Sequence, residues 1–191
     1  TIGKKGRFTI FNNTLYFTNG TDTVQTWDGV TASTSNLTNP AADWGAGDQP
    51  IKLIVHGKGN SERLAAIGSA DQPESLYLSA NGSDNFVTGV VKINIKESTG
   101  DGGIVDAHDF GNNLFLFSKK QAYILTDVSL TITDWGYTTA QLHGGVSHDG
   151  LSCKTPNDII CFTDNADVYS IKTSLTYGDY VAASVARPSF I

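Results

Sequence analysis

One pattern occurs four times along the chain: a run of apolar residues, a polar turn and a second strand-like run. Successive copies are 49, 50 and 45 residues apart, counted between the first apolar residues of the runs, Leu15, Leu64, Leu114 and Ile159. Repeats of this length, made of strands and turns, stack so that each unit buries its apolar surface against its neighbours. The spacing therefore predicts an all-β fold of about four antiparallel units, as in the blades of a β-propeller or partial propeller.

Two of the apolar runs, Leu114–Phe117 and Ile159–Phe162, do not alternate between apolar and polar residues. Successive side chains of a strand point to opposite faces, so a strand with one solvated face should alternate. We therefore expect both faces of these strands to be covered, with Phe117 and Phe162 buried. The inner strand of a propeller blade meets apolar surface on both sides. A β-sandwich with a few buried strands is the alternative, but it does not need a repeat.

We expect a single domain, 1–191, in which each repeat supplies one blade. The expected blades span residues 1–37, 51–97, 103–133 and 145–191. Residues 130–133 should close the third blade, and residues 145–153 should open the fourth. Five dipeptides that favour tight turns separate the strand-like runs: Asn19-Gly20, Asp28-Gly29, Asn81-Gly82, Asp101-Gly102 and Asp149-Gly150. Because the chain begins at Thr1 and contains no methionine, we expect it to be part of a longer polypeptide.

The charge balance of the chain argues against phosphate binding as its main task. It has 19 acidic residues against 13 lysines and arginines, a net charge of -6. Binding nucleic acid through its phosphates needs clustered cations, whereas the basic residues here are mostly scattered. No apolar run reaches the roughly 18 residues of a membrane span, so we expect no membrane span.

Two combinations of residues are considered as catalytic or metal-binding candidates. Ser147, His148 and Asp149 are the residue types of a hydrolase triad, but neighbours in a strand point to opposite faces and cannot converge. Asp106 and His108 share one face of a strand, yet no third ligand follows at a recognisable spacing. A hydrogen-bonded strand histidine is therefore favoured over a metal pair. We expect no catalytic activity, no metal and no cofactor.

Three polar turns have the composition of short calcium loops: residues 19–22, 81–84 and 164–167. They lack the distant acidic ligand of a full calcium loop. Asparagine and aspartate side chains that bond to the backbone in tight turns explain the same composition without a metal.

Cys153 and Cys161 lie close enough in the sequence to face each other across a hairpin. A cross-strand disulfide and two free thiols both fit this spacing. We favour the free thiols, because paired positions in adjacent strands of a reduced protein need no bond.

Residues 38–50 form a long connection that is rich in turn-forming residues and carries Trp44 between Pro40 and Pro50. The prolines limit the entropy that the loop would lose on docking, so Trp44, Pro40 and Pro50 are the candidate assembly contact. The alternative is that Trp44 is tucked between two blades. Trp135, which precedes the fourth unit in a similar context, is expected to seal a junction in the same way.

Residues 60–68, 72–79 and 82–86 share an order of residue types. They contain Arg-Leu, small residues and glycine, then proline, an aromatic residue and serine, and finally a polar turn that ends in an aromatic residue. This order resembles the blades of β-propeller structural proteins of tailed bacteriophages, the tail nozzle, hub and DNA-stabilisation proteins. Residues 144–169 fit the same pattern, with Asn165-Ala166 where those proteins commonly have an Asp/Asn-Gly turn. The resemblance covers roughly residues 8–175.

The resemblance implies a structural component of a phage tail, located in the virion and acting through assembly. It also implies the partners: further copies in a ring, other tail proteins, and DNA that passes through the lumen of the ring. An acidic lumen would suit such passage, because it would repel a polyanion that a basic lumen would hold. The alternative is an extracellular propeller that binds or cleaves carbohydrate. Such an enzyme usually brings paired carboxylates on loops, whereas the acidic residues here are spread among turns.

Overall fold

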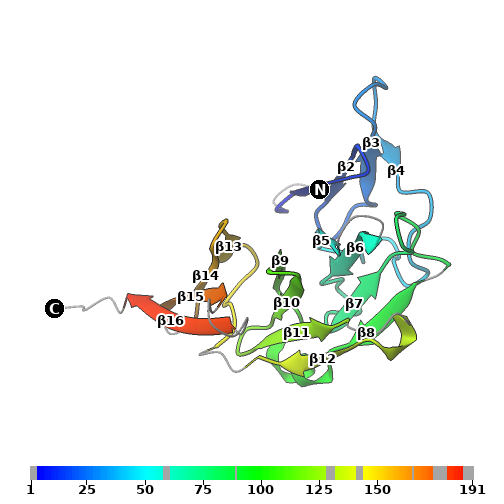
Figure 1. Ribbon diagram of the computed structural model, residues 1–191. Helices are drawn as coiled ribbons and strands as arrows, with labels where there is room; N and C mark the ends of the chain where they lie inside the picture. Colours follow the sequence, from blue (N-terminus) through cyan, green and yellow to red (C-terminus); the bar gives the residue numbers. More distant parts are fainter. Residues whose placement is uncertain are drawn as a thin grey trace.

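The computed structural model describes residues 4–57, 61–88, 90–127, 132–140, 144–164, 166–173 and 180–186. These residues form four separate sheets of four antiparallel strands each, which follow one another along the chain (Figure 1). Within each sheet the strands lie in chain order, from the first to the fourth. No sheet closes on itself among these strands. The predicted all-β fold of four antiparallel units is confirmed at this level.

The first two sheets contain the first and second repeats. The strands of the first sheet are β1 (Arg7–Phe11), β2 (Thr14–Thr18), β3 (Gln25–Trp27) and β4 (Ser35–Asn36). Those of the second sheet are β5 (Lys52–His56), β6 (Arg63–Ile67), β7 (Ser75–Leu78) and β8 (Val91–Asn94). A 3-10 helix, η2 (Lys96–Asp101), leads from the second sheet to the third.

The other two sheets contain the third and fourth repeats. The strands of the third sheet are β9 (Asp106–Phe110), β10 (Asn113–Phe117), β11 (Ala122–Thr126) and β12 (Gly136–Thr139). Those of the fourth sheet are β13 (Ser152–Lys154), β14 (Asp158–Phe162), β15 (Val168–Thr173) and β16 (Tyr180–Ala186). Each predicted apolar run is therefore the second strand of its own sheet.

Two predicted boundary strands are wrong. The third sheet closes with β12, not with residues 130–133: residues 130 and 131 lie outside the described residues, and Ile132–Asp134 is a 3-10 helix, η3. The fourth sheet opens at Ser152, because the backbone of residues 147–150 turns before the strand begins. The carbonyl of His148 accepts a hydrogen bond from the Leu151 N–H at 3.2 Å, which closes this turn.

The turns have the backbone that their residues favour. Asn12 and Asn13 join β1 to β2 with φ values of 49° and 59°, and Gly111 and Asn112 join β9 to β10 with 59° and 72°. Two successive residues with positive φ give a turn whose twist matches that of the flanking strands. The glycines of all five predicted turn dipeptides also have positive φ: Gly20, Gly29, Gly82, Gly102 and Gly150.

Consecutive sheets pack face to face, and each junction encloses its own apolar cluster. Leu64 and Ala66 of β6 belong to the cluster shared with the first sheet, whereas Ala65 and Ile67 belong to the cluster shared with the third. We call these two sides of a sheet its preceding face and its following face. In β10, Leu114 and Leu116 are on the preceding face and Phe115 and Phe117 on the following face. The absence of alternation in these strands is thus explained by burial on both faces.

The burial predicted for Phe117 is confirmed and that for Phe162 is wrong. Phe117 is 0% exposed, but Phe162, at the equivalent position of the fourth sheet, is 46% exposed. The preceding face of β14 packs on the third sheet through Ile159 and Cys161. No described segment packs on its following face, where the side chain of Phe162 lies, so β14 alternates in burial although its sequence does not alternate in polarity.

Gly103 provides a test of the close contact between the β6–β7 loop and the segment that leads into the third sheet. Gly102 and Gly103 both have positive φ, 83° and 91°, but an added Cβ meets nothing at Gly102, whereas at Gly103 it would lie 2.5 Å from the carbonyl oxygen of Pro73. We expect Gly102→Ala to cost about 1 kcal/mol of folding free energy. Gly103→Ala should cost about 1–3 kcal/mol more, because a backbone has to move. Urea unfolding of the two variants measures the difference, and equal losses would contradict the close contact.

Candidate functional site

The first strands of the four sheets, β1, β5, β9 and β13, lie next to one another in that order. Polar side chains gather where they meet, which is unusual for the inner part of a stacked β-structure. Lys52 of β5, Asp106 and His108 of β9 and Ser152 of β13 form one connected group. We call these four residues the inner-strand cluster.

Asp106 is the centre of the inner-strand cluster. Its Oδ1 accepts a hydrogen bond from Lys52 Nζ at 2.6 Å, and its Oδ2 accepts one from Ser152 Oγ at 2.5 Å. Lys52 Nζ also donates to the carbonyl of Ala107 at 2.6 Å. The Nε2 atom of His108 lies 2.8 Å from Ser152 Oγ. The cluster therefore ties the second, third and fourth sheets together.

The protonation states in the inner-strand cluster follow from burial and charge. Burial alone would raise the pKa of Asp106, but Lys52 and the other partners hold this pKa below its ordinary value. Burial, and then the charge of Lys52, lower the pKa of His108 to about 4. His108 is therefore neutral at pH 7. Because Ser152 donates its proton to Asp106, the His108 ring completes the hydrogen bond by donating from Nε2.

This geometry gives the inner-strand cluster a structural role. In a hydrolase triad the histidine accepts the proton of the serine, and the carboxylate binds the far side of the histidine. Here the serine proton goes directly to a carboxylate whose pKa is lowered, and His108 is a donor. The preference for a hydrogen-bonded strand histidine at His108, made from the sequence, is confirmed. Sequence reasoning did not find Lys52 or Ser152, because they belong to other sheets.

Asp106→Asn should reveal the contribution of the inner-strand cluster to stability. The change leaves the ammonium of Lys52, only 17% exposed, without its counter-charge. We expect a loss of about 2–3 kcal/mol in the free energy of unfolding. Asp149→Asn is the matched control, because it breaks a more exposed ion pair with Arg7 and should cost less than about 1 kcal/mol. Chemical denaturation at pH 7 compares the two, and a larger loss for Asp149→Asn would contradict the assignment.

A second buried polar group, which the sequence did not predict, joins the second and third sheets. The ring of His56, in β5, is 1% exposed and lies between two carboxylates. Its Nδ1 is 2.7 Å from Asp109 Oδ2, and its Nε2 is 2.8 Å from Asp127 Oδ2. Burial alone would lower the pKa of His56, but the hydrogen bonds to the two carboxylates outweigh it and raise this pKa above its ordinary value.

Arg63 continues this polar region along the same junction. It pairs with His56 across β5 and β6, and its guanidinium carbon lies 4.8 Å from the ring centroid of Trp135. The charge of Asp127 also acts on Arg63. Trp135 packs against the apolar cluster between the second and third sheets. The prediction that Trp135 seals a junction is confirmed.

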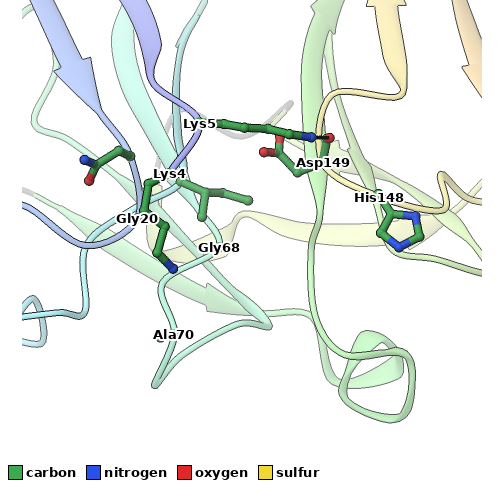
Figure 2. Close-up of a pocket in the computed structure, with 9 residues that line it drawn as sticks. Lys4, Lys5, Gly20, Gly68, Ala70, His148 and Asp149 are labelled. Carbon is green, nitrogen blue, oxygen red and sulfur yellow. Dashed lines mark hydrogen bonds between the residues drawn. The ribbon is translucent and has the colours of Figure 1, made fainter. Parts of the chain in front are cut away.

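A cavity of about 430 Å³ lies beside the first strands (Figure 2). It is lined by Lys4, Lys5, Asn19, Gly20, Ile51, Gly68, Ala70, His148 and Asp149. Lys5 Nζ donates to the carbonyl of Asp149 at 2.9 Å, as the dashed line in Figure 2 shows. Arg7 Nη2 donates to Asp149 Oδ1 at 2.5 Å. These contacts hold the start of the first sheet against the loop that precedes the fourth.

The structure does not bring Ser147, His148 and Asp149 together. Ser147 is buried, His148 is exposed, and Asp149 is bound by Arg7 and Lys5. Figure 2 shows the His148 ring apart from Asp149. The three residues do not converge, as the sequence predicted. The reason differs, however: they lie in a turn, and not on opposite faces of a strand.

The turn at residues 19–22 is held by its own side chain. The N–H groups of Thr21 and Asp22 donate to Asn19 Oδ1 at 3.1 and 2.8 Å, and Asn19 Nδ2 donates to Asp22. These are the bonds from an asparagine side chain to the backbone that the sequence predicted for this turn. Asn165, in the third of the predicted turns, lies outside the described residues. Within the part of the chain that the structure describes, no three His, Cys, Asp or Glu residues are grouped to hold a metal ion.

Trp44 lies in the apolar cluster between the first and second sheets. Its ring centroid is 5.5 Å from that of Tyr77 and 4.7 Å from that of Phe86, and 7% of the residue is exposed. Trp44 is therefore tucked between two sheets, which was the alternative to an assembly contact. Its buried side chain is not available to a partner. Pro50 is buried as well and Pro40 is half-buried. An assembly contact through residues 38–50 stays a prediction that now depends on exposed residues such as Ala42 and Gly45.

Cys153 and Cys161 are free thiols, as favoured from the sequence. The expectation that they face each other is wrong. Cys153 pairs with Ile160, and Cys161 pairs with Ser152, so the two thiols lie on opposite faces of the fourth sheet. Cys161 is buried, which raises its pKa to about 12, and Cys153 is exposed.

Comparison of the sequence with protein-family models and with curated proteins finds no match. Within the described ranges, no helix has the length and apolar character needed to cross a membrane.

Proposed function

We propose that the four sheets are blades of a β-propeller and that the protein is a structural component of a bacteriophage tail, of the nozzle or hub type. The observation that carries the proposal is the repeated stacking of four-stranded sheets through their faces, with the first strands adjacent. In a propeller the first strands surround an axis and each blade is covered by its neighbours. The protein would act by assembly within the virion.

The resembling segments support a structural role because their residues serve packing. Residues 63–67 form β6, in which all five residues are buried, and residues 75–78 form β7, which is buried throughout. The two residues of the Arg-Leu pair contact different sheets. Leu64 packs towards the first sheet, and Arg63 lies over the ring of Trp135 at the junction with the third. The resembling residues therefore build the junctions between the sheets, which is the stacking on which the proposal rests.

We do not extend the proposal to an acidic lumen that repels passing DNA. It required acidic side chains near the axis, where the first strands meet. There the described acids are paired: Asp106 with Lys52, Asp109 with His56, and Asp149 with Arg7. Lys4 and Lys5 line the neighbouring cavity. We therefore propose assembly as the function and do not propose that an acidic lumen lets DNA slide.

The alternative of a carbohydrate-active propeller would need two carboxylates that face one cleft. Among the described residues that line the cavity beside the first strands, Asp149 is the one acid, and Arg7 binds its carboxylate. We therefore propose that the chain is not an enzyme. A screen of the purified chain against glycan and ester substrates should give no turnover above buffer. Turnover that Asp149→Asn abolishes would favour the alternative.

Electron microscopy of virions tests the proposed function directly. Phage particles purified from the source of this sequence are analysed by mass spectrometry, and their tails are reconstructed. We expect peptides of this chain in the particles and density at the tail that accommodates the four sheets. Peptides found exclusively outside particles, or tails without such density, would overturn the proposal.

A further inference from the structure

Three buried oxygen atoms have no hydrogen-bond partner in the turns before β5 and after β6. They are Oδ2 of Asp48, Oε1 of Gln49 and Oγ of Ser69, and the three residues are 5%, 4% and 2% exposed. A buried polar atom of a folded protein nearly always has a partner, and each exception needs an explanation. Carboxylate and amide oxygens accept and do not donate, so the missing partner of Asp48 and Gln49 is a donor or a cation.

The two turns that carry these atoms lie against each other. β5 and β6 are antiparallel, and the pairing of Lys52 with Ile67 places the chain before β5 beside the chain after β6. Further along, the Asp71 N–H donates to Asp48 Oδ1 at 2.9 Å. Asp48 and Ser69 therefore belong to one contact between two turns at the same end of the second sheet.

Gln49 belongs to the same contact. The carbonyl of Gly45 accepts hydrogen bonds from the Asp48 N–H at 3.1 Å and from Gln49 Nε2 at 2.9 Å. The amide of Gln49 is therefore folded back against the turn that carries Asp48. The Gln49 N–H donates to the carbonyl of Gly20 at 3.4 Å, which also attaches this contact to the turn at residues 19–22.

Asp48 decides what the missing partner is, because its carboxylate is buried without a counter-charge. Within the described part of the chain, no lysine, arginine or histidine pairs with this carboxylate. Buried charges in proteins are normally paired or coordinate a metal ion. Asp106, the other buried acid among the described residues, follows this rule through Lys52 at 2.6 Å. A cation is therefore the partner that Asp48 lacks.

We propose that these turns bind a calcium ion, with Asp48 Oδ2, Gln49 Oε1 and Ser69 Oγ as ligands. Calcium takes about six to eight oxygen ligands in flexible geometry, from carboxylates, amide and backbone carbonyls, and water. One carboxylate among neutral ligands predicts weak binding, with a Kd of about 0.1–1 mM. The ion supplies the counter-charge of Asp48 and joins the turn before β5 to the turn after β6.

The surroundings of the site are compatible with an ion. Gly68 and Ala70, on either side of Ser69, line the cavity shown in Figure 2, so solvent comes within one residue of the site. One acid with neutral oxygen ligands is not a group of three His, Cys, Asp or Glu side chains, which the described residues lack. The sequence did not predict the site, because its ligands come from two separate turns. The site concerns the fold and is independent of the proposed function.

Calcium should stabilise the chain against unfolding, and the effect should depend on Asp48. Urea unfolding is measured in EDTA and in CaCl2 up to about 10 mM, and the rise of the midpoint with calcium gives the Kd. Asp48→Asn keeps an acceptor for the Asp71 N–H but removes the charge, so it should bind calcium at least about ten-fold more weakly. Asp28→Asn, in an exposed turn, is the matched control and should leave the calcium response unchanged.

Gln49→Glu tests the ligand set with a change of the opposite sign. A second carboxylate beside Asp48 should lower the unfolding midpoint in EDTA, because two like charges would be buried together. In calcium the new carboxylate becomes a charged ligand, and the Kd should fall about ten-fold. A folded Gln49→Glu variant without any gain in calcium affinity would overturn the proposed ligand set.

Terbium, which binds to calcium sites, locates the ion within the chain. Trp44 precedes Gly45 in the turn that carries Asp48, so excitation of Trp44 should sensitise the luminescence of terbium bound there. Trp44→Phe should remove most of this luminescence and leave the effect of calcium on the unfolding midpoint in place. Luminescence that survives Trp44→Phe would place the ion elsewhere and contradict the site.

Three further outcomes would overturn the inference. The first is an unfolding midpoint that is the same in EDTA and in calcium. The second is an equal rise in MgCl2 or in NaCl at the same ionic strength, because the effect would then not be specific to calcium. The third is a calcium effect that Asp48→Asn retains in full, because the buried carboxylate would then not hold the ion.

Discussion

Phe117→Ala is expected to lower the free energy of unfolding by about 3–5 kcal/mol. The Phe117 ring is 0% exposed and lies between the third and fourth sheets, with its centroid 6.4 Å from that of Phe115. Removing it leaves a cavity that two sheets border, and the hydrogen bonds of β10 to both neighbouring strands limit how far the backbone can collapse. Urea unfolding monitored by fluorescence and by circular dichroism measures the loss.

Phe162→Ala is the matched control at the equivalent position of the repeat. The same change of side chain occurs in the second strand of the fourth sheet, where 46% of the residue is already exposed. We expect a loss below about 1 kcal/mol for a residue that keeps this much contact with water. Similar losses for the two variants would contradict the difference in burial. A loss below about 1 kcal/mol at Phe117 would show that the third junction is not packed as described.

The strands could be predicted because their signals are local. An apolar run between turn residues identifies a strand, and the type of turn follows from Asn12-Asn13 and Gly111-Asn112 themselves. Whether a face of a strand is covered is a different kind of information. Ile159–Phe162 and Leu114–Phe117 look alike in sequence, but only the second run has described sheets on both sides. The polarity of the sequence therefore predicted which faces of a strand are apolar enough to be buried. It did not predict which of those faces another sheet covers.

The polar groups between the sheets could not be predicted, because their members come from distant parts of the chain. His56 meets Asp109 and Asp127, which are 53 and 71 residues away. Asp106 and His108 were recognised as a pair on one strand, but Lys52 and Ser152 join them from other sheets. Trp44 shows a further limit: a tryptophan in a polar, proline-containing loop can fold back into an apolar cluster.

His56→Gln is expected to cost about 3 kcal/mol at pH 6, where a pKa raised above 6.5 leaves the ring charged, because it removes the positive charge between Asp109 and Asp127. The two carboxylates would then face each other across a neutral side chain while 25% and 22% of their own side chains are exposed. This partial exposure places the expected loss at the lower end of the range for a broken buried pair. The triple variant His56→Gln, Asp109→Asn, Asp127→Asn removes the repulsion as well and should recover part of the loss.

The pH dependence separates a charged histidine from a merely buried one. The pKa of His56 is raised above 6.5 in the folded chain, so the folded state holds this proton more tightly than the unfolded state. The stabilisation that His56 gives the folded chain is fully present below the pKa that the residue has in the unfolded chain. It is lost as the pH rises through the pKa of the folded chain. The free energy of unfolding should therefore fall on the alkaline side of pH 6.5. In His56→Gln this alkaline decrease should be absent.

His108 makes the comparison sharper, because its shift has the opposite sign. Burial and the charge of Lys52 lower its pKa to about 4, so the unfolded state binds the proton more tightly. Its contribution to the pH profile is a loss of stability as the pH falls from 6.5 towards 4. Unfolding curves across this whole range should show His56→Gln altering the alkaline side and His108→Gln the acidic side. An alkaline decrease that survives His56→Gln would mean that another group causes it, and that Asp109 and Asp127 do not hold a protonated ring.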